Sequence, residues 1–276
     1  MRNTLCGKGS LSRTAVAGLV AMAFAPFLPG CLDGGSRQIL NRAYTELDSR
    51  QYDDADSDAD EFLRAHPNGS GVGEAYYLKG RIEEQRAQDP QVSSTHADKQ
   101  GHLDAARDEY TRGLESIAPS TVKALLHSGV ANVDFYEEDY STAAREWQIA
   151  YDNLTSEDQR AWVLYHIGRC DQRLGMFDKA DEAFAMVQRL YPASEASIRA
   201  ASRTGMKAFF VEVGSFPSEK NAETAAAELR KEGYAASRSI DIGRQIVRVG
   251  PITSYAEAKA FQGRLRAQYP GAIISP

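Results

Sequence analysis

The sequence predicts two folded parts, an all-α array of helical repeats followed by a smaller α+β domain with the element order βαββαβ. Small residues recur at matched positions through the middle of the chain, which indicates paired helices. After residue 206 the pattern changes to alternating apolar and polar residues, which indicates strands. The charge changes at the same point: residues 31–206 hold 19 basic and 31 acidic side chains, whereas residues 207–276 hold 10 basic and 7 acidic ones.

Residues 1–30 have the charge pattern of a secretory signal peptide. Their three basic residues precede an uncharged, mostly apolar run over residues 15–29. This run is shorter than the roughly 20 residues that a membrane-spanning helix needs, and prolines interrupt it. We therefore expect export of the chain and removal of this segment.

The apolar run ends in Leu-Pro-Gly-Cys at residues 28–31, which resembles the lipobox of bacterial lipoproteins. In that family a peptidase cuts before the cysteine, whose sulfur then carries a diacylglyceryl group. The resemblance implies a lipid on Cys31, a membrane-anchored tether over residues 31–36, and a position facing the periplasm. Leu32 replaces the aspartate that would favour the inner membrane, so the outer membrane is favoured. An ordinary signal peptide that is cut nearby is the alternative.

Four alanines share one local context, which predicts about four helix pairs over residues 37–205. Each alanine follows a large apolar residue by three positions. A small side chain lets the two helices of a pair approach closely, and the large side chains fill the groove between pairs. The four combinations are Tyr52 with Ala55, Leu103 with Ala106, Tyr140 with Ala143, and Phe177 with Ala180.

This pattern resembles the tetratricopeptide repeat, most closely over residues 165–192. The resemblance implies an extended surface that binds an unidentified protein partner. A generic helical bundle is the alternative. Within the array, the polar residues 85–102 predict a mobile loop, and the acidic run at residues 53–58 predicts a solvated helix face. The formal charge of −12 over residues 31–206 favours a basic partner or serves solubility.

The sequence contains no Gly-x-Ser-x-Gly, Walker, His-Glu-x-x-His or Cys-x-x-Cys motif. Cys170 lies four residues after His166, but no third residue that would orient the imidazole is evident, so we interpret Cys170 as a packing residue. His96 and His102 lack the spacing and the cysteine partners of a metal site. We therefore expect a non-catalytic protein without a metal or cofactor.

Residues 207–276 predict four strands and two helices. The order βαββαβ places both helices on one face of a four-stranded antiparallel sheet and leaves the other face open. The strands are expected over residues 208–216, 234–242, 245–249 and 272–275, and the helices over residues 218–229 and 254–268.

Three segments of this domain resemble the SPOR domain, the sporulation-related repeat: VEVGSF at 211–216, VRVGP at 247–251 and AEA at 256–258. The resemblance covers residues 207–276 and implies binding of peptidoglycan at the open face of the sheet, on glycan strands stripped of their stem peptides. RNA-binding domains share this strand order, but the first strand lacks their motif and export separates the chain from RNA. We therefore expect no nucleic-acid partner.

Alternation along the strands predicts which side chains meet the glycan. The valines of the first and third strands point toward the helices, so their neighbours point outward. Ser215 is added because it matches a serine of the family. Glu212 stands where the family usually has glutamine, and Ile246 stands where it often has arginine. The predicted peptidoglycan-binding residues are Phe210, Glu212, Ser215, Arg244, Ile246 and Arg248.

Together these features predict a non-catalytic cell-envelope lipoprotein of cell division or cell-wall remodelling. The lipid would anchor the chain, the repeats would hold a protein partner, and the C-terminal domain would hold septal glycan. The alternative is a repeat scaffold for secretion or outer-membrane assembly whose C-terminal domain has weak or no affinity for glycan. The departures at Glu212 and Ile246 are consistent with that alternative.

Overall fold

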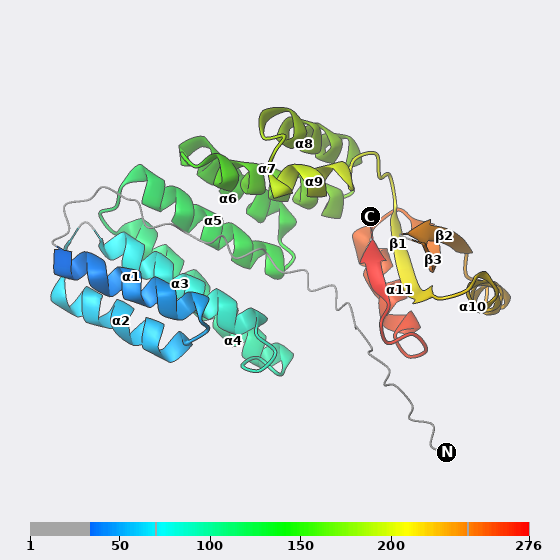
Figure 1. The fold of residues 1–276 in the computed structure, drawn as a ribbon, viewed down its shortest axis with the longest axis horizontal. Coiled ribbons are helices and arrows are strands. Elements are labelled where there is room, and N and C mark those ends of the chain that lie inside the picture. The colour runs from blue at the N-terminus through cyan, green and yellow to red at the C-terminus, as the bar shows by residue number, and fades with distance from the viewer. Residues whose placement is uncertain (1–33, 70, 242, 276) are drawn as a thin grey trace, which may run out of the picture.

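The computed structural model describes residues 34–69, 71–241 and 243–275. Within these residues, nine helices form an elongated array, and a small domain of four strands and two helices follows it (Figure 1). The predicted signal peptide and the predicted lipidation site at Cys31 lie outside the described residues. None of the described helices is long and apolar enough to cross a membrane.

The array consists of helix pairs that stack one after another (Figure 1). This is the repeat architecture that the recurring alanines predict. The short helix α9 (Glu195–Ala201) packs on the last pair. The pairs are α1 (Gly34–Asp48) with α2 (Tyr52–Ala65), α3 (Val72–Gln88) with α4 (His96–Glu115), α5 (Ser120–Tyr136) with α6 (Tyr140–Asn153), and α7 (Glu157–Arg173) with α8 (Phe177–Leu190).

Small residues lie where the helices touch, as the spacing predicts. All four recurring alanines have 0% exposed surface. Large side chains fill the gaps beside them: a Cβ at Gly80 or Gly129 would lie 2.4 Å from the ring of Tyr110. Since atoms in a close-packed interior do not approach so closely, glycine at both positions lets α3 and α5 enclose this ring.

The prediction of a loop over residues 85–102 is wrong, because most of these residues are helical. Only residues 89–95 connect α3 to α4. Thr95 begins α4 with a capping box: its hydroxyl accepts a hydrogen bond from the amide of Asp98, and the Asp98 carboxylate accepts one from the amide of Thr95. The extra residues of this repeat therefore lengthen α4, which has 20 residues where α2, α6 and α8 have 14, and the connection that precedes it.

The acidic run at residues 53–58 is only partly solvated, contrary to the prediction. Asp58 is 8% exposed and accepts hydrogen bonds from the guanidinium of Arg42 in α1. The carboxylate of Asp56 lies 2.7 Å from the ammonium of Lys79 in α3. The run therefore ties α2 to the helices on both sides of it.

The first helix also begins earlier than expected, since Gly34 to Ser36 belong to α1 and not to a tether. Ser36 is 3% exposed, and its hydroxyl oxygen lies 2.6 Å from Nε2 of His66 at the end of α2. This contact holds the first turn of α1 against the neighbouring helix.

The C-terminal domain has the predicted order βαββαβ and a fully antiparallel sheet. The strands lie in the order β2-β3-β1-β4. Both helices pack on one face, where valines of β1 and β3 meet alanines and leucines of α10 and α11 in one apolar core. The elements are β1 (Phe209–Phe216), α10 (Glu219–Lys231), β2 (Ala236–Asp241), β3 (Arg244–Ile252), α11 (Tyr255–Leu265) and β4 (Ile273–Ser275).

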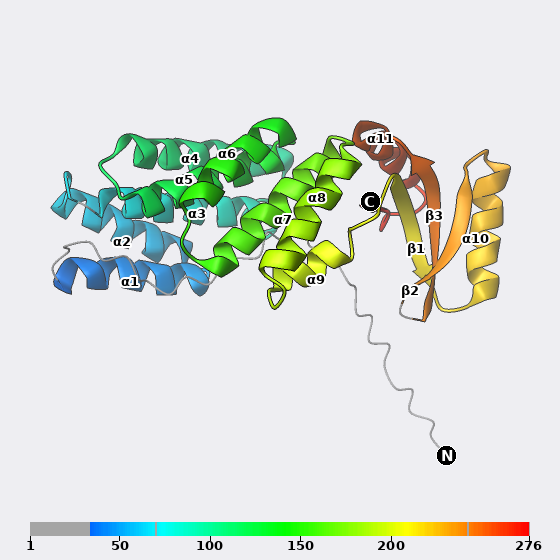
Figure 2. The same ribbon diagram turned by 90° about the horizontal axis from the view of Figure 1, so that it is seen from above.

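This domain lies next to the end of the array (Figure 2), and aromatic side chains make the contact. The ring of Phe177, at the start of α8, lies 5.3 Å from the ring of Phe209 in β1. The ring of Tyr255, at the start of α11, lies 5.7 Å from that of Tyr140 in α6. The contact therefore uses the end of the domain at which β1 and α11 begin.

Candidate functional site

The predicted binding residues lie together on the face of the sheet that no described helix covers. On β1 and β3 they alternate with buried valines, as the sequence predicts. Glu212 is paired directly with Arg248 across the two strands, and Ser215 is paired with Ile246. Arg244 lies at the far end of β3, where it is exposed.

A β-bulge brings Ser215 onto this face. Strict alternation along β1 would turn its side chain toward the helices. The register between β1 and β3 shifts just before Gly214, so Ser215 is paired with Ile246 and is exposed, while Phe216 packs against the core. Sequence reasoning included Ser215 only by family resemblance, because alternation alone does not reveal a bulge.

Phe210 and Arg248 form a combined apolar and cationic platform. The guanidinium carbon of Arg248 lies 4.2 Å from the centroid of the Phe210 ring. Gly250, with φ of +143°, permits this arrangement, because a Cβ there would lie 2.8 Å from Cδ1 of the ring. An aromatic face suits the apolar face of a sugar ring, and a guanidinium suits its hydroxyl or carboxylate oxygens.

Arg248 makes no hydrogen bond or ion pair with any residue that the structure describes. Its Nε is buried and has no acceptor. Glu212, its cross-strand neighbour, forms no ion pair with it in the described part of the chain. A buried polar atom without a partner costs about 1–3 kcal/mol, and an acceptor on a ligand would remove that cost.

Sequence reasoning missed the residues that flank this platform. Ser237 and Ser239 of β2 are paired with the central residues of β3 on this face. Ile273 of β4 is paired with Glu212 and is 39% exposed. Directly paired residues share a face of the sheet, so these side chains extend the platform on both sides. The strand register identifies them, and a single sequence does not contain the register.

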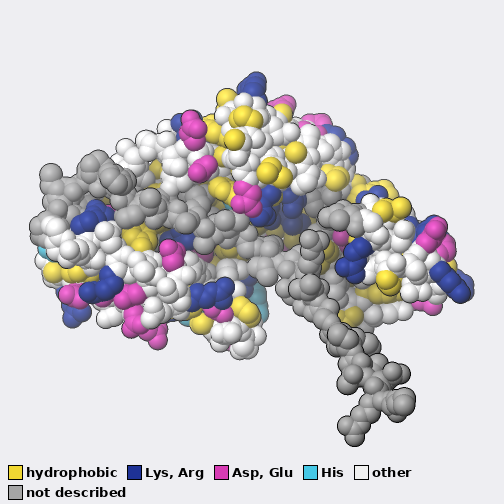
Figure 3. Space-filling model, in the orientation of Figure 1, with side chains coloured by type: hydrophobic (Ala, Val, Ile, Leu, Met, Phe, Trp, Pro, Cys, Tyr) yellow, Lys and Arg dark blue, Asp and Glu magenta, His cyan; other side chains and the backbone are white. Residues whose placement is uncertain are grey.

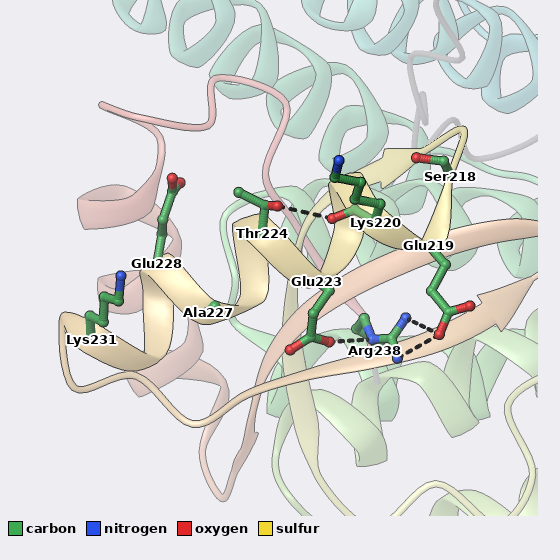
Figure 4. A pocket seen from close by; sticks show the side chains of 9 residues that line it. All are labelled: Ser218, Glu219, Lys220, Glu223, Thr224, Ala227, Glu228, Lys231 and Arg238. Atoms are coloured by element: carbon green, nitrogen blue, oxygen red, sulfur yellow. Dashed lines mark hydrogen bonds and ion pairs between the residues drawn. The ribbon is translucent and has the colours of Figure 1, made fainter.

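A second depression lies along α10, on the helix-covered side of the sheet (Figure 4). Its central cation is Arg238 of β2. The guanidinium of Arg238 donates a hydrogen bond of 3.0 Å to Glu219, and its Nε lies 2.8 Å from the carboxylate of Glu223. The guanidinium of Arg238 therefore has two carboxylate partners within the protein, whereas that of Arg248 has none among the described residues.

Cys170 is a packing residue, as the sequence indicates. It has 0% exposed surface, and burial raises the pKa of its thiol. The ring of His166 stacks on that of Trp147 with centroids 4.8 Å apart, and burial lowers the pKa of His166. The thiol therefore stays protonated near pH 7, and a reactive thiolate does not form. Among the described residues, no group of three His, Cys, Asp or Glu side chains is placed to hold a metal ion.

Comparison with known families agrees with both predicted resemblances. Residues 205–276 match the SPOR domain, and residues 162–194 match a tetratricopeptide repeat. No curated protein matches the chain. The chain thus carries a SPOR domain, a peptidoglycan-binding module, after a helical repeat region of the type that binds proteins. Both are binding domains and not catalytic ones.

Proposed function

We propose that this protein is a non-catalytic cell-envelope lipoprotein that binds denuded peptidoglycan strands through the open sheet face of its SPOR domain. The observation that carries the proposal is the Phe210 and Arg248 platform on that face. The ring offers an apolar surface to a sugar, and the unpartnered guanidinium offers donors to an anion.

The preference for denuded strands follows from charge. Removal of a stem peptide frees the carboxylate of each muramic acid, and a carboxylate is the preferred partner of a guanidinium. Residues 207–276 hold 10 basic and 7 acidic side chains, so the domain as a whole attracts an anionic polymer.

The rest of the proposal concerns position in the cell. Cys31 would carry the lipid that anchors the chain, with the outer membrane favoured, and the repeats would hold a partner that remodels the wall at division sites. The order of lipobox-like motif, repeats and SPOR domain supports this arrangement. Metabolic labelling with a fatty acid tests the anchor: Cys31→Ser should abolish the label, and a retained label would contradict lipidation at that residue.

Cosedimentation with purified sacculi tests the glycan proposal. Binding should rise when an amidase has removed the stem peptides. Arg248→Ala should weaken binding about tenfold or more, because a hydrogen bond to a charged group is worth about 1.5–3 kcal/mol. Arg238→Ala removes the same charge from the opposite side of the domain and should leave binding unchanged. Binding that does not rise after amidase treatment would contradict the proposal.

The alternative is a repeat scaffold whose SPOR domain has lost its affinity for glycan. Glu212 favours it, because a carboxylate beside Arg248 competes with an anionic ligand for the same guanidinium. In the same experiment this alternative predicts little binding to either form of the sacculi, and Glu212→Gln would then restore it.

A further inference from the structure

The last repeat holds three arginines without an acidic partner among the described residues: Arg169 and Arg173 of α7, and Arg203 just after α9. We call them the arginine cluster. Arg169 is 9% exposed, and its Nε has no hydrogen-bond acceptor. One terminal nitrogen of Arg173, Nη1, is buried and also lacks an acceptor. Within the described part of the chain, Arg203 donates hydrogen bonds to neutral groups, at 3.0 Å to the hydroxyl of Tyr165 and 3.4 Å to the amide oxygen of Gln172.

The three guanidiniums lie close enough to repel one another. Arg169 and Arg173 are one turn apart on α7, so they lie on the same side of that helix. Burial, and then repulsion from Arg203, lowers the pKa of Arg169 to about 10. Burial also lowers the pKa of Arg173, and Arg203 adds to that effect. A guanidinium stays charged near pH 7 in proteins, so Arg169 and Arg173 place a concentrated positive charge in the last repeat that no described carboxylate pairs with.

Aromatic rings support two of these side chains. The guanidinium carbon of Arg169 lies 4.6 Å from the centroid of the Phe135 ring, and that of Arg173 lies 3.9 Å from the centroid of Tyr255. A ring face attracts a cation, but it uses only the flat side of the guanidinium. The N–H donors at the edge are left for another acceptor.

Space for an acceptor lies beside Arg173. A pocket of about 390 Å³ is lined by Arg173 together with Tyr140, Tyr255 and Lys259. The acidic residue in this pocket, Glu138, is already bound by Lys259 at 2.6 Å. Figure 3 shows Lys and Arg side chains gathered in the hollow below α7 and α9, where the array meets the C-terminal domain.

We propose that the arginine cluster binds the carboxylates of an acidic segment of a partner protein. This inference rests on the proposed role of the repeats as a protein-binding surface. Guanidiniums bind carboxylates with strong, often bidentate hydrogen bonds, and carboxylates are the anionic groups that every protein can supply. The net charge of the array favours a basic partner, but the local charge at this site favours an acidic one.

The two tryptophans of the chain provide a direct readout, because both lie beside this site. The ring of Trp147 stacks on His166 at 4.8 Å, and that of Trp162 lies 5.9 Å from the same imidazole. The chain from residue 32 to 276 would be titrated with a short peptide rich in aspartate and glutamate while tryptophan fluorescence is recorded. A lysine-rich peptide and inorganic phosphate would be titrated in parallel.

A saturable fluorescence change with the acidic peptide is expected. Arg169→Gln and Arg173→Gln should each weaken it about tenfold or more. Arg189→Gln is the matched control, since it removes an exposed arginine from α8 and should leave the affinity unchanged. No saturable change, an equal response to phosphate, or an equal loss in the control would overturn the proposal.

Two further measurements separate this proposal from others. Thermal unfolding of Arg169→Gln should show no loss of stability, because the variant removes an uncompensated buried charge; a fall in melting temperature together with lost binding would assign Arg169 a structural role and overturn the proposal. Sedimentation of the same variant with amidase-treated sacculi should be unchanged. Failure of peptide binding is thereby distinguished from failure of glycan binding.

Discussion

The first three repeats and the last repeat differ in how their charged side chains are paired. In the first three, buried carboxylates are paired with arginines across helices: Arg42 binds Asp58, and a guanidinium nitrogen of Arg107 lies 2.8 Å from the carboxylate of Asp134. In the last repeat, Arg169 and Arg173 have no such partner among the described residues. The comparison indicates that paired charges hold the helices together, whereas unpaired charges are available to a ligand.

The same difference separates the two sides of the SPOR domain. Arg238, on the side covered by helices, is held by two glutamates of α10 (Figure 4). Among the described residues, Arg248, on the open side, contacts the ring of Phe210 and has no ion-pair partner. The unpaired arginine is the one that lies on the surface proposed to bind glycan.

The largest expected change in the free energy of unfolding comes from breaking an ion pair in the first three repeats. Arg107→Met would leave Asp134, which is 2% exposed, as a buried and unpaired charge. Removing one partner of a buried pair costs about 3–5 kcal/mol. Since Arg107 is itself partly exposed, we expect the lower end of that range from denaturant unfolding. Arg145→Met, at an exposed site of α6, is the control; equal losses in both variants would remove the distinction between paired and free arginines.

Two histidines extend the comparison to the pH dependence of stability. Nδ1 of His127 in the third repeat lies 2.7 Å from the carboxylate of Glu146, whereas His166 in the last repeat is buried among arginines. Burial, and then repulsion from Arg169, lowers the pKa of His166 below its usual value near 6.5. In the folded chain His166 therefore stays neutral at pH values where the unfolded chain is protonated.

The unfolded state thus binds more protons below about pH 6.5, and the free energy of unfolding should fall as the pH decreases, by up to about 1.4 kcal/mol per pH unit from this residue. His166→Phe should lose this part of the pH dependence between pH 7.5 and 5.5, as followed by urea unfolding at each pH. An unchanged slope in this variant would show that His166 is not the group responsible.

Removal of an unpaired arginine should change the free energy of unfolding in the opposite direction to removal of a paired one. Arg169→Met replaces a buried charge without a counter-ion by an apolar side chain of similar length, so we expect the free energy of unfolding to rise by about 1 kcal/mol. Denaturant unfolding checks this. A loss comparable to that of Arg107→Met would mean that the contact with Phe135 is essential to the fold.

Much of the fold is predictable from local patterns. The recurring alanines predict the helix pairs because helix packing needs small residues at fixed intervals. The alternation around the valines of β1 and β3 predicts the face of most candidate residues, because side chains on a strand alternate. Each of these signals lies within a few residues of the position that it describes.

The features that sequence reasoning missed depend on contacts between distant residues. The capping box at Thr95 is a local exception, whereas the pairing of Asp58 with Arg42 needs the helix arrangement. The bulge before Ser215 depends on the register with β3. The arginine cluster brings together α7 and the segment after α9, and only the three-dimensional arrangement shows that no described carboxylate forms an ion pair with it.

Mapping of bound glycan on the SPOR domain tests the central claim most directly. Amide hydrogen exchange would be measured on the chain with and without soluble denuded glycan strands. Protection of the strands around Phe210 and Arg248, without protection of α10, is the predicted result. Protection confined to α10, whose glutamates hold Arg238, would contradict the claim, because it would place the glycan on the side of the domain where the arginine is already paired.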